Sequence, residues 1–398
     1  MPKKSTNLHR LVELVTIMKS AIRDPRVQGR SRHLLIDIIV ITICAVLCGA
    51  ESVSEIEDFA IDREEWLRKY LKLTNGIPSH DTIGRVLSII DASQMQCAFA
   101  QWAQGLKKGA VKRISLDGKC TKGTERIFNR GKQALKTVSA YAHDLGLSLV
   151  EASTEQGGEI SATLACLDLL DLKGVLVQVD AGVGVNSVVV EIKNKKGDYL
   201  VPLKSNQWLY RNEVQACIES SKAKLQTAEL EGSAHGRDER RTCKLLLASK
   251  MSEKFNQQWP HAKSIFLITR ERVEDDKRYV IQETGKDSKQ SYRLNDNDLK
   301  YSVEEVYYVS SRKLTADQAL KEVRSHWAIE NKVHWVLDVA FREDHWTVRS
   351  KKLAQKLSII RKIALNIIRQ TPGKGGVRRR MKRASWNQEY LETLMFNF

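Results

Sequence analysis

The chain has 398 residues, of which 42% are hydrophobic and 28% charged, an ordinary composition for a globular protein with a large core. Its 65 Lys and Arg residues outnumber 48 Asp and Glu residues, and a formal net charge of +17 favours a polyanionic partner, nucleic acid before an anionic membrane. The seven cysteines are scattered without a Cys-x-x-Cys pair, which argues against structural zinc and a disulfide framework and fits a reducing cytoplasm.

Residues 1–108 are predicted to be helical throughout. Leu34–Ala50 is nearly all apolar and close to the length of a short membrane span, but Asp37 inside it and charged flanks favour a buried core helix. Ser79 is predicted to cap a helix that runs to about Ile90. Several short helices in a basic protein are compatible with a helix-turn-helix reader of DNA, and equally with a plain helical bundle.

The pattern changes near residue 111, where short apolar runs begin to alternate with helical segments. We expect strands at 113–117, 135–142 and 147–152, a helix at 159–172, a strand at 175–179, a helix at 187–195 and a strand at 199–203. Three strands, a helix, a strand, a helix and a strand are the order of a ribonuclease H-like mixed sheet. The predicted fold class is therefore α/β, preceded by an all-α N-terminal domain.

The next segment, at about 205–312, is polar and is read as a strand-rich insertion, with strands at 264–269, 278–282 and 305–309. A helix is predicted over Thr315–Phe341, with Thr315 as its cap and Gln318 three residues on, and a second over Lys352–Arg369. The predicted domains are 1–108, a catalytic domain at 109–372 that contains the insertion, and a basic C-terminal tail at 373–398.

Two carboxylates follow apolar strands in this arrangement. Asp117 ends the first strand and Asp180 follows the run at 175–179, and functional groups gather at the carboxyl ends of strands in open α/β sheets. Two neighbouring carboxylates repel unless a cation lies between them, and Mg²⁺ or Mn²⁺ prefers such oxygen ligands. Each Asp taken alone could equally cap a strand or a turn.

A third carboxylate, Glu330, lies mid-helix beside a predicted apolar stripe of Ile329, Val333, Val336 and Ala340. A solvated glutamate is the simple interpretation, but the His, Trp and Asn residues around Glu330 favour a functional one. His326, Glu330 and His334 are spaced by four residues. No His-Glu-x-x-His motif occurs, so zinc is disfavoured.

The sequence resembles the H-repeat-associated insertion-sequence transposases of bacteria over nearly its whole length. The matching stretches are Asp24–Arg30, Gly76–Val86, Ile114–Lys119, Val138–Ala140, Asp198–Gln207 and Ser325–Asp344. The resemblance implies a ribonuclease H-like catalytic domain with a strand-rich insertion and a triad of acids, with Asp117 and Asp180 at its two Asp positions and Glu330 at its Glu. It implies a DNA transposase that holds two Mg²⁺ (or Mn²⁺) ions, acts on terminal inverted repeats and target DNA as a homodimer, and lies in the bacterial cytoplasm with the nucleoid.

The three carboxylates are expected to converge. The residues expected to contact DNA are Lys119, Lys204, Asn206, Arg324, Lys332, Arg378, Arg379 and Arg380. Two alternatives remain: an inactive or co-opted sequence-specific DNA-binding protein of the same fold, and a membrane-surface protein that uses residues 34–50.

Overall fold

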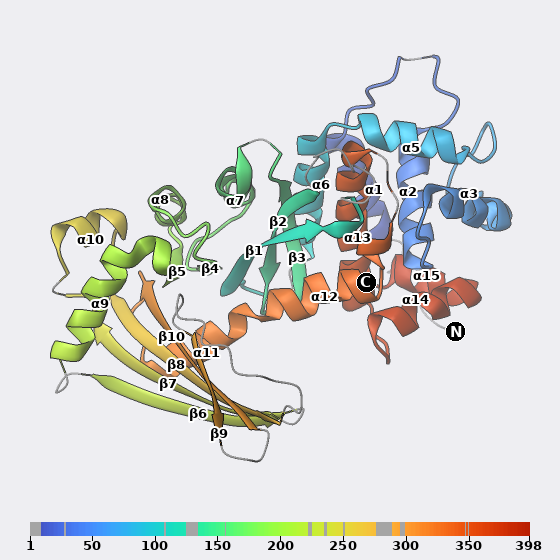
Figure 1. The fold of residues 1–398 in the computed structure, drawn as a ribbon. Coiled ribbons are helices and arrows are strands. Elements are labelled where there is room, and N and C mark those ends of the chain that lie inside the picture. Colours follow the sequence, from blue (N-terminus) through green and yellow to red (C-terminus); the bar gives the residue numbers. More distant parts are fainter. Residues whose placement is uncertain are drawn as a thin grey trace. The chain divides into compact units, whose positions relative to one another are not determined.

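The computed structural model describes residues 9–27, 29–106, 109–124, 134–155, 157–221, 225–234, 237–249, 251–275, 289–294, 299–346, 348 and 350–398. These residues form a mixed α/β protein (Figure 1). The chain divides into two compact units. The first contains residues 1–111, 117–170 and 329–398, and the second contains 112–116 and 171–328. The predicted domain boundaries near 108 and 372 stay predictions, since compact units need not coincide with independently folding domains.

The described residues before the first strand form helices joined by non-helical connections, such as 29–34 and 71–79. Their helices are α1 (His9–Ala21), α2 (Leu35–Leu47), α3 (Val53–Asp62), α4 (Glu64–Leu67), α5 (His80–Ile89) and α6 (Ala92–Gly105). Helix α2 is buried from Asp37 to Leu47, which confirms the core-helix interpretation of this segment. No helix among the described residues is both long and apolar enough to cross a membrane.

Local sequence signals set the ends of several helices. The Ser79 side chain accepts a hydrogen bond from the backbone of Thr82, which confirms it as the cap of α5. Helix α13 (Lys351–Gln370) packs against α2, α5 and α6 and is buried from Leu353 to Ile368. Because α13 carries charged residues inside this core, their charges must be matched by partners from other elements.

The first unit also holds the start of the predicted sheet. Strands β2 (Leu135–Ala142) and β3 (Leu147–Ser153) form an antiparallel hairpin, as predicted. Strand β1 is longer than predicted: it spans Arg113–Thr121, so Asp117 lies in the middle of the strand and does not end it. The strand order here is β3-β2-β1. The remaining elements are the 3₁₀ turn η1 (Lys122–Thr124) and helix α7 (Gly158–Asp168), which packs on β2 and β3.

The second unit contains a large mixed sheet in the order β1-β4-β5-β10-β8-β7-β6, with β9 also paired to β10. Strand β4 is parallel to both β1 and β5, and the ladders from β5 through β10, β8, β7 and β6 are antiparallel. Its strands are β4 (Leu176–Val179), β5 (Asp198–Leu203), β6 (Gln226–Ala234), β7 (Arg237–Leu247), β8 (Ser264–Asp275), β9 (Lys289–Leu294) and β10 (Leu299–Ser310). Its helical elements are α8 (Asn186–Asn194), η2 (Ser205–Gln207), α9 (Trp208–Ser220), α10 (Glu253–Gln258) and α11 (Ala316–His326).

The predicted insertion is therefore strand-rich, and its long strands continue the sheet. The predicted strands at 264–269 and 305–309 are confirmed within β8 and β10, and the one at 278–282 lies outside the described residues. Helix α11 packs on β6 and β7 over an apolar cluster that includes Leu200, Phe266 and Leu320. A capping box between Thr315 and Gln318 starts α11, as the sequence predicts.

The single helix predicted over Thr315–Phe341 is interrupted. After α11, the first unit contains a π-helical turn, η4 (Glu330–His334), followed by α12 (Trp335–Val339) and the 3₁₀ turn η5 (Glu343–His345). The buried apolar residues from 329 to 341 are Ile329, Val333, Leu337 and Phe341, spaced by four. The predicted stripe was wrong at Val336 and Ala340, which are only half-buried. A four-residue spacing exceeds the 3.6-residue period of an α-helix, and the wider π turn absorbs the difference.

The C-terminal segment predicted as a basic tail forms two helices, α14 (Val377–Trp386) and α15 (Gln388–Phe396). Apolar residues at helical spacing, among them Met381, Ala384, Leu391 and Leu394, are buried. Both helices pack against α13. The basic residues are therefore mounted on a folded surface, because the apolar residues between them anchor each helix.

Candidate active site

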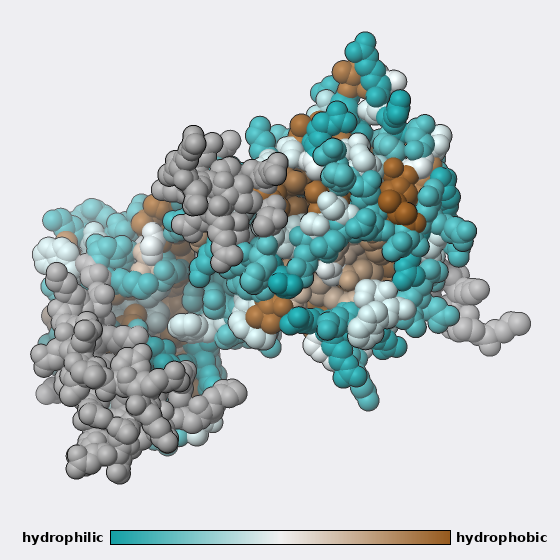
Figure 2. All heavy atoms as spheres, turned by 45° about the vertical axis from the view of Figure 1, so that its right-hand side comes forward, coloured by the Kyte–Doolittle hydropathy of each residue, from teal (hydrophilic) through white to brown (hydrophobic). Residues whose placement is uncertain are grey.

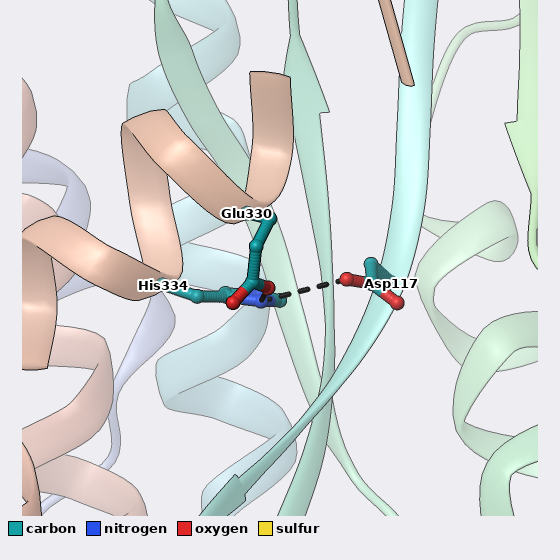
Figure 3. A group of neighbouring side chains, drawn as sticks. All are labelled: Asp117, Glu330 and His334. Atoms are coloured by element: carbon teal, nitrogen blue, oxygen red, sulfur yellow. Dashed lines mark hydrogen bonds and ion pairs between the residues drawn. The ribbon is translucent and has the colours of Figure 1, made fainter. Parts of the chain in front are cut away.

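Three side chains from two distant parts of the sequence, Asp117 on one and Glu330 with His334 on the other, meet in the first unit (Figure 3). The Nδ1 atom of His334 lies 2.9 Å from Oε2 of Glu330 and 3.5 Å from Oδ2 of Asp117. One ligand atom from each of the three residues lies within 4.8 Å of the other two. The structure thus brings together two of the three predicted acids and adds a histidine.

Glu330 and His334 are four residues apart in the π turn η4, and helical residues at this spacing lie next to each other. Both residues belong to this turn, in which the chain makes one wide loop of the helix, and such turns are frequent at functional sites. His334 is 3% exposed while the Glu330 side chain is 51% exposed, so the imidazole forms the floor and the carboxylate the open side. The hydrogen bond to His334 lowers the pKa of Glu330, so this carboxylate is ionised at neutral pH.

The donor set suits a divalent cation. In an octahedral shell with bonds of about 2.1 Å, neighbouring ligand atoms are about 3 Å apart. The separations of 2.9 and 3.5 Å around His334 are close to that spacing. Two carboxylates favour Mg²⁺ or Mn²⁺, and an imidazole shifts the preference toward transition-metal ions. The Nε2 atom of His334 is buried and has no hydrogen-bond partner among the described residues, so Nδ1 is the nitrogen directed at the acids.

Asp180, the second predicted acid, belongs to the second unit. It follows β4 directly, and its carboxylate oxygens lie 3.0 and 3.4 Å from Nζ of Lys204, which follows β5. Partial burial would raise the pKa of Asp180, but the Lys204 ammonium outweighs this and lowers it. Lys204 therefore holds Asp180 ionised.

The loop after Asp180 is built for close packing. The backbone N–H of Gly184 donates to the carbonyl of Asp180 at 2.9 Å. A Cβ at Gly184 would lie 2.2 Å from Cγ1 of Val201, so only glycine fits here without a shift. Gln207 Nε2 donates to the carbonyl of Gly184 at 2.8 Å, which joins the loops after β4 and β5. The joined loops fix both Asp180 and Lys204.

Lys119 has a different environment from the one predicted. It is 8% exposed, and its ammonium contacts Asp338 and lies 2.6 Å from Oε2 of Glu343. Burial alone would lower the pKa of Lys119, but the two carboxylates outweigh it and raise the pKa. A buried lysine held by two acids cannot reach a DNA phosphate, so the predicted contact is corrected. Lys119 instead ties β1, which carries Asp117, to the segment that follows Glu330 and His334.

Glu343 is the centre of this buried ionic cluster. It is 1% exposed, and its second oxygen accepts a hydrogen bond from Arg361 of α13 at 3.1 Å. The Arg361 guanidinium lies over the Trp346 ring, 4.0 Å from the centroid. Lys362, the next residue on α13, pairs with buried Glu151 of β3. The cluster joins β1, β3, η5 and α13 around the candidate site.

Of the other residues predicted to contact DNA, one is buried and the rest have side chains exposed to solvent. Arg380 is 6% exposed, and its guanidinium donates to the carbonyls of Ile368 and Thr371 and to the Tyr390 hydroxyl. It is a structural link between α13, α14 and α15, which corrects the predicted phosphate contact. The residues whose side chains remain open to solvent are Lys204, Asn206, Arg324, Lys332, Arg378 and Arg379.

His334 is the site residue that sequence reasoning set aside. Its spacing of four residues from Glu330 and eight from His326 matches no known zinc motif, so the sequence pattern alone does not assign it a role. The available signal was the four-residue spacing of Ile329, Val333, Leu337 and Phe341, which brings His334 next to the buried face. His326 belongs to the second unit, at the end of α11.

Two protein families match the chain. The family described as "Transposase DDE domain" matches residues 83–367, and the family described as "DDE_Tnp_1-associated" matches residues 18–103. All three predicted acids, together with His334, lie inside the first match.

Proteins similar to the chain over most of its length carry related names. "Putative transposase YncI" of Escherichia coli O157:H7 is 34% identical, over 94% of this chain and 93% of its own length. "H repeat-associated putative transposase YhhI" of Escherichia coli K12 is 30% identical, over 96% and 98%. Among solved structures, a piggyBac transposase in a synaptic complex with hairpin DNA aligns with a TM-score of 0.41 at 9% identity, covering 97% of this chain and 78% of that one.

Proposed function

The chain belongs to the transposase DDE domain family, among the H-repeat-associated members, and from this premise we propose that it cuts and rejoins DNA at the ends of an insertion sequence. The proposed enzyme binds the terminal inverted repeats, cleaves a strand at each element end and joins the released 3′-hydroxyl to target DNA. Two ends must be held together for this reaction, so we infer that a homodimer acts in the bacterial cytoplasm, with the nucleoid.

The observation that carries the proposal is the meeting of Asp117, Glu330 and His334 within 4.8 Å. These side chains come from a strand and a π turn, and they form an open carboxylate site on a buried imidazole floor. A catalytic group of this kind must be held in place before the substrate arrives. The buried ionic cluster around Lys119 and Glu343 supplies that support.

Asp180 completes the proposed triad, and the register of β1 and β4 supports its inclusion. Leu116 and Val179 are partners across this parallel ladder, and each is followed directly in the chain by an acid, Asp117 within β1 and Asp180 just after β4. Parallel strands direct corresponding residues toward the same edge of a sheet. The chain order and the β1-β4-β5 parallel core likewise support a ribonuclease H-like catalytic domain.

Asp117, Asp180 and Glu330 would hold Mg²⁺ or Mn²⁺, with His334 beside them. Bound divalent ions would supply Lewis-acid activation and charge neutralisation for in-line phosphoryl transfer. In the first step a water oxygen bonds to phosphorus, the bond from phosphorus to the 3′ oxygen breaks, and that oxygen leaves with a proton as a 3′-hydroxyl. In the second step the oxygen of this hydroxyl bonds to a target phosphorus, the bond from that phosphorus to its own 3′ oxygen breaks, and the displaced oxygen leaves with the proton as a new 3′-hydroxyl. Lys204 is placed to neutralise Asp180 until the site is loaded.

A plasmid carrying the DNA that flanks this gene tests the proposal. We expect the full chain to nick or cut it at the element ends in Mg²⁺ or Mn²⁺, leaving 3′-hydroxyl termini, and to do nothing in EDTA. Specific binding to the same ends without cleavage in either ion would instead establish the alternative, a DNA-binding protein with an idle nuclease site. If the chain neither binds nor cleaves this DNA, both the proposed transposase and the alternative DNA-binding protein are refuted.

Helix α14 offers a second part of the proposed DNA interface. Its exposed side carries Arg378, Arg379 and Lys382, and Trp386 at its end is 77% exposed. Each phosphate neutralised on a duplex contributes about 0.9 to the slope of log affinity against log salt concentration. Replacing the three basic residues by serine should flatten this slope by up to about 2.7 and weaken binding to every duplex alike.

The matched comparison is Arg380→Ala in the same helix. This change leaves two buried carbonyls and the Tyr390 hydroxyl without their donor, so it should lower the free energy of unfolding by roughly 1.5–3 kcal/mol. Thermal unfolding and fluorescence anisotropy measured on both variants separate the two roles. A triple serine variant with an unchanged salt slope would show that α14 does not touch DNA.

A further inference from the structure

The connection between α1 and α2 and the start of α5 enclose an open hollow in the first unit. Its volume is about 850 Å³, and its polar lining includes Arg26, Arg30, Arg32, Asn75, Thr82 and Arg85. We call it the arginine hollow. In Figure 1 the α1–α2 connection projects beyond α5, and Figure 2 shows mainly hydrophilic side chains over this projecting part.

The charged side chains that line the arginine hollow are arginines and therefore positive. None of the described residues that line it is acidic. Arg26 is paired with Asp24 at 2.7 Å, whereas Arg30, Arg32 and Arg85 are exposed and make no ion pair with any described residue. Three guanidinium groups directed into solvent around one cavity repel one another, and an anionic ligand would relieve that repulsion.

The hollow is held open by its own backbone. Arg30 donates its N–H to the carbonyl of Val27 at 3.2 Å in a turn where Gly29 has a φ of 77°. Across the hollow, Nδ2 of Asn75 donates to the carbonyl of Arg32 at 2.5 Å. The connection is therefore tied to the segment that leads into α5, and the arginines are positioned before any ligand binds.

Two of the stretches that carry the family resemblance border this hollow. They are Asp24–Arg30 and Gly76–Val86, and neither contributes an acid to the candidate active site. On α5 the exposed residues Asp81, Arg85 and Ile89 follow a four-residue spacing, while Ile83 and Leu87 are buried. The helix thus presents one polar side while its other side anchors it in the core.

We propose that the arginine hollow and the exposed side of α5 bind duplex DNA, with Arg30 and Arg32 on backbone phosphates and α5 in the major groove. A guanidinium matches phosphate oxygens and the edge of guanine, and a major groove admits one α-helix. Val27 is 65% exposed and Ile89 47% exposed on the same lining, which suits sugar and thymine-methyl contacts and not a free phosphate ion. This assignment rests on the proposed function, since it names the surface that recognises the element ends.

The test uses the full chain with Asp117→Asn, in EDTA, so that binding is measured without cleavage. The variant Arg30→Gln/Arg32→Gln/Arg85→Gln is titrated by fluorescence anisotropy on a 30-base-pair duplex of mixed sequence and on a duplex from the DNA that flanks the gene. We expect its salt slope to flatten by about 2–3, one unit or slightly less for each lost contact. The control Lys69→Gln/Lys72→Gln/Lys352→Gln removes the same charge from exposed residues outside the hollow and should leave the slope within about one unit.

Arg85→Gln alone should reduce the preference for the flanking duplex over the mixed one by about tenfold or more, because a side chain in the groove reads bases. Equal slopes for the hollow and control variants would overturn the proposal. So would competition by millimolar inorganic phosphate or ATP, which would mark a small-anion site. If the hollow variant loses binding while the unmodified chain shows no cleavage, the DNA surface stands and the proposed catalytic function fails. If the hollow variant keeps its binding, and the same three substitutions made without Asp117→Asn leave cleavage in Mg²⁺ intact, only the surface assignment fails.

Discussion

Asp117→Asn, Asp180→Asn and Glu330→Gln should each reduce strand cleavage by about a thousandfold or more. The amide keeps the shape of the side chain but loses the charge that holds a divalent ion. Metal ions supply several kcal/mol of transition-state stabilisation, and each 1.4 kcal/mol is worth about tenfold in rate. Cleavage of a labelled end duplex in Mg²⁺, under single-turnover conditions, measures the effect.

The matched control is Asp344→Asn. Asp344 lies near the site, where its carboxylate accepts a hydrogen bond from the backbone of Lys122, but it is outside the three-residue group. We expect this variant to cut within about tenfold of the unmodified chain. Binding of Mn²⁺, followed by electron paramagnetic resonance, should weaken in Glu330→Gln and His334→Gln while thermal unfolding changes little. Near-normal cutting by any of the three acid variants would remove that residue from the triad.

The second large effect is expected at Glu343. Replacing it by alanine removes a buried partner from both Lys119 and Arg361, and should lower the free energy of unfolding by roughly 3–5 kcal/mol. Glu343→Gln keeps the volume and should lose a similar amount, because the missing charge is what matters. The exposed residue Glu389, changed to Gln, should alter stability by less than about 0.5 kcal/mol. Urea unfolding followed by circular dichroism measures all three.

Lowering the pH should weaken the stabilisation that the buried ionic cluster around Glu343 provides. Burial alone would raise the pKa of Glu343, but Lys119, Lys362 and Arg361 outweigh it and hold the pKa well below the ordinary value of 4.5. The stabilisation from this carboxylate is therefore complete above about pH 4.5 and is lost as the pH falls through its lower folded pKa. The unmodified chain should lose its stability advantage over Glu343→Gln as the solution is acidified. A difference that does not depend on pH would mean that the glutamate acts through its shape.

Local patterns predicted the elements better than they predicted contacts. The strand at Leu135–Ala142, the Ser79 cap and the Thr315 capping box depend on residues a few positions apart, and all were predicted. Strands β6, β7 and β9 were not predicted because their sequences are rich in polar and charged residues. Their pairing depends on partners far along the chain.

The errors in the candidate site have the same origin. Lys119 and Arg380 look like surface cations in sequence, but each is buried by partners that no local pattern reveals: Glu343, 224 residues from Lys119, and Tyr390 with the end of α13. Glu330 was found because its neighbours were unusual for a solvated helix. Its convergence with Asp117 follows only from the fold. Convergence with Asp180 stays a prediction.

The π turn at Glu330–His334 sets the direction in which the following helix faces. In a regular α-helix each residue advances the direction of its side chain by about 100°, so residues four apart differ by about 40°. Ile329 and Leu337 are two such steps apart, so in a regular α-helix their side chains would diverge by about 80°. The widened turn removes part of this divergence. Without the π turn, the helix would have to expose one of these two apolar residues or rotate Asp338 away from Lys119. The π turn therefore fixes both the geometry of the acid site and the packing of the residues beneath it.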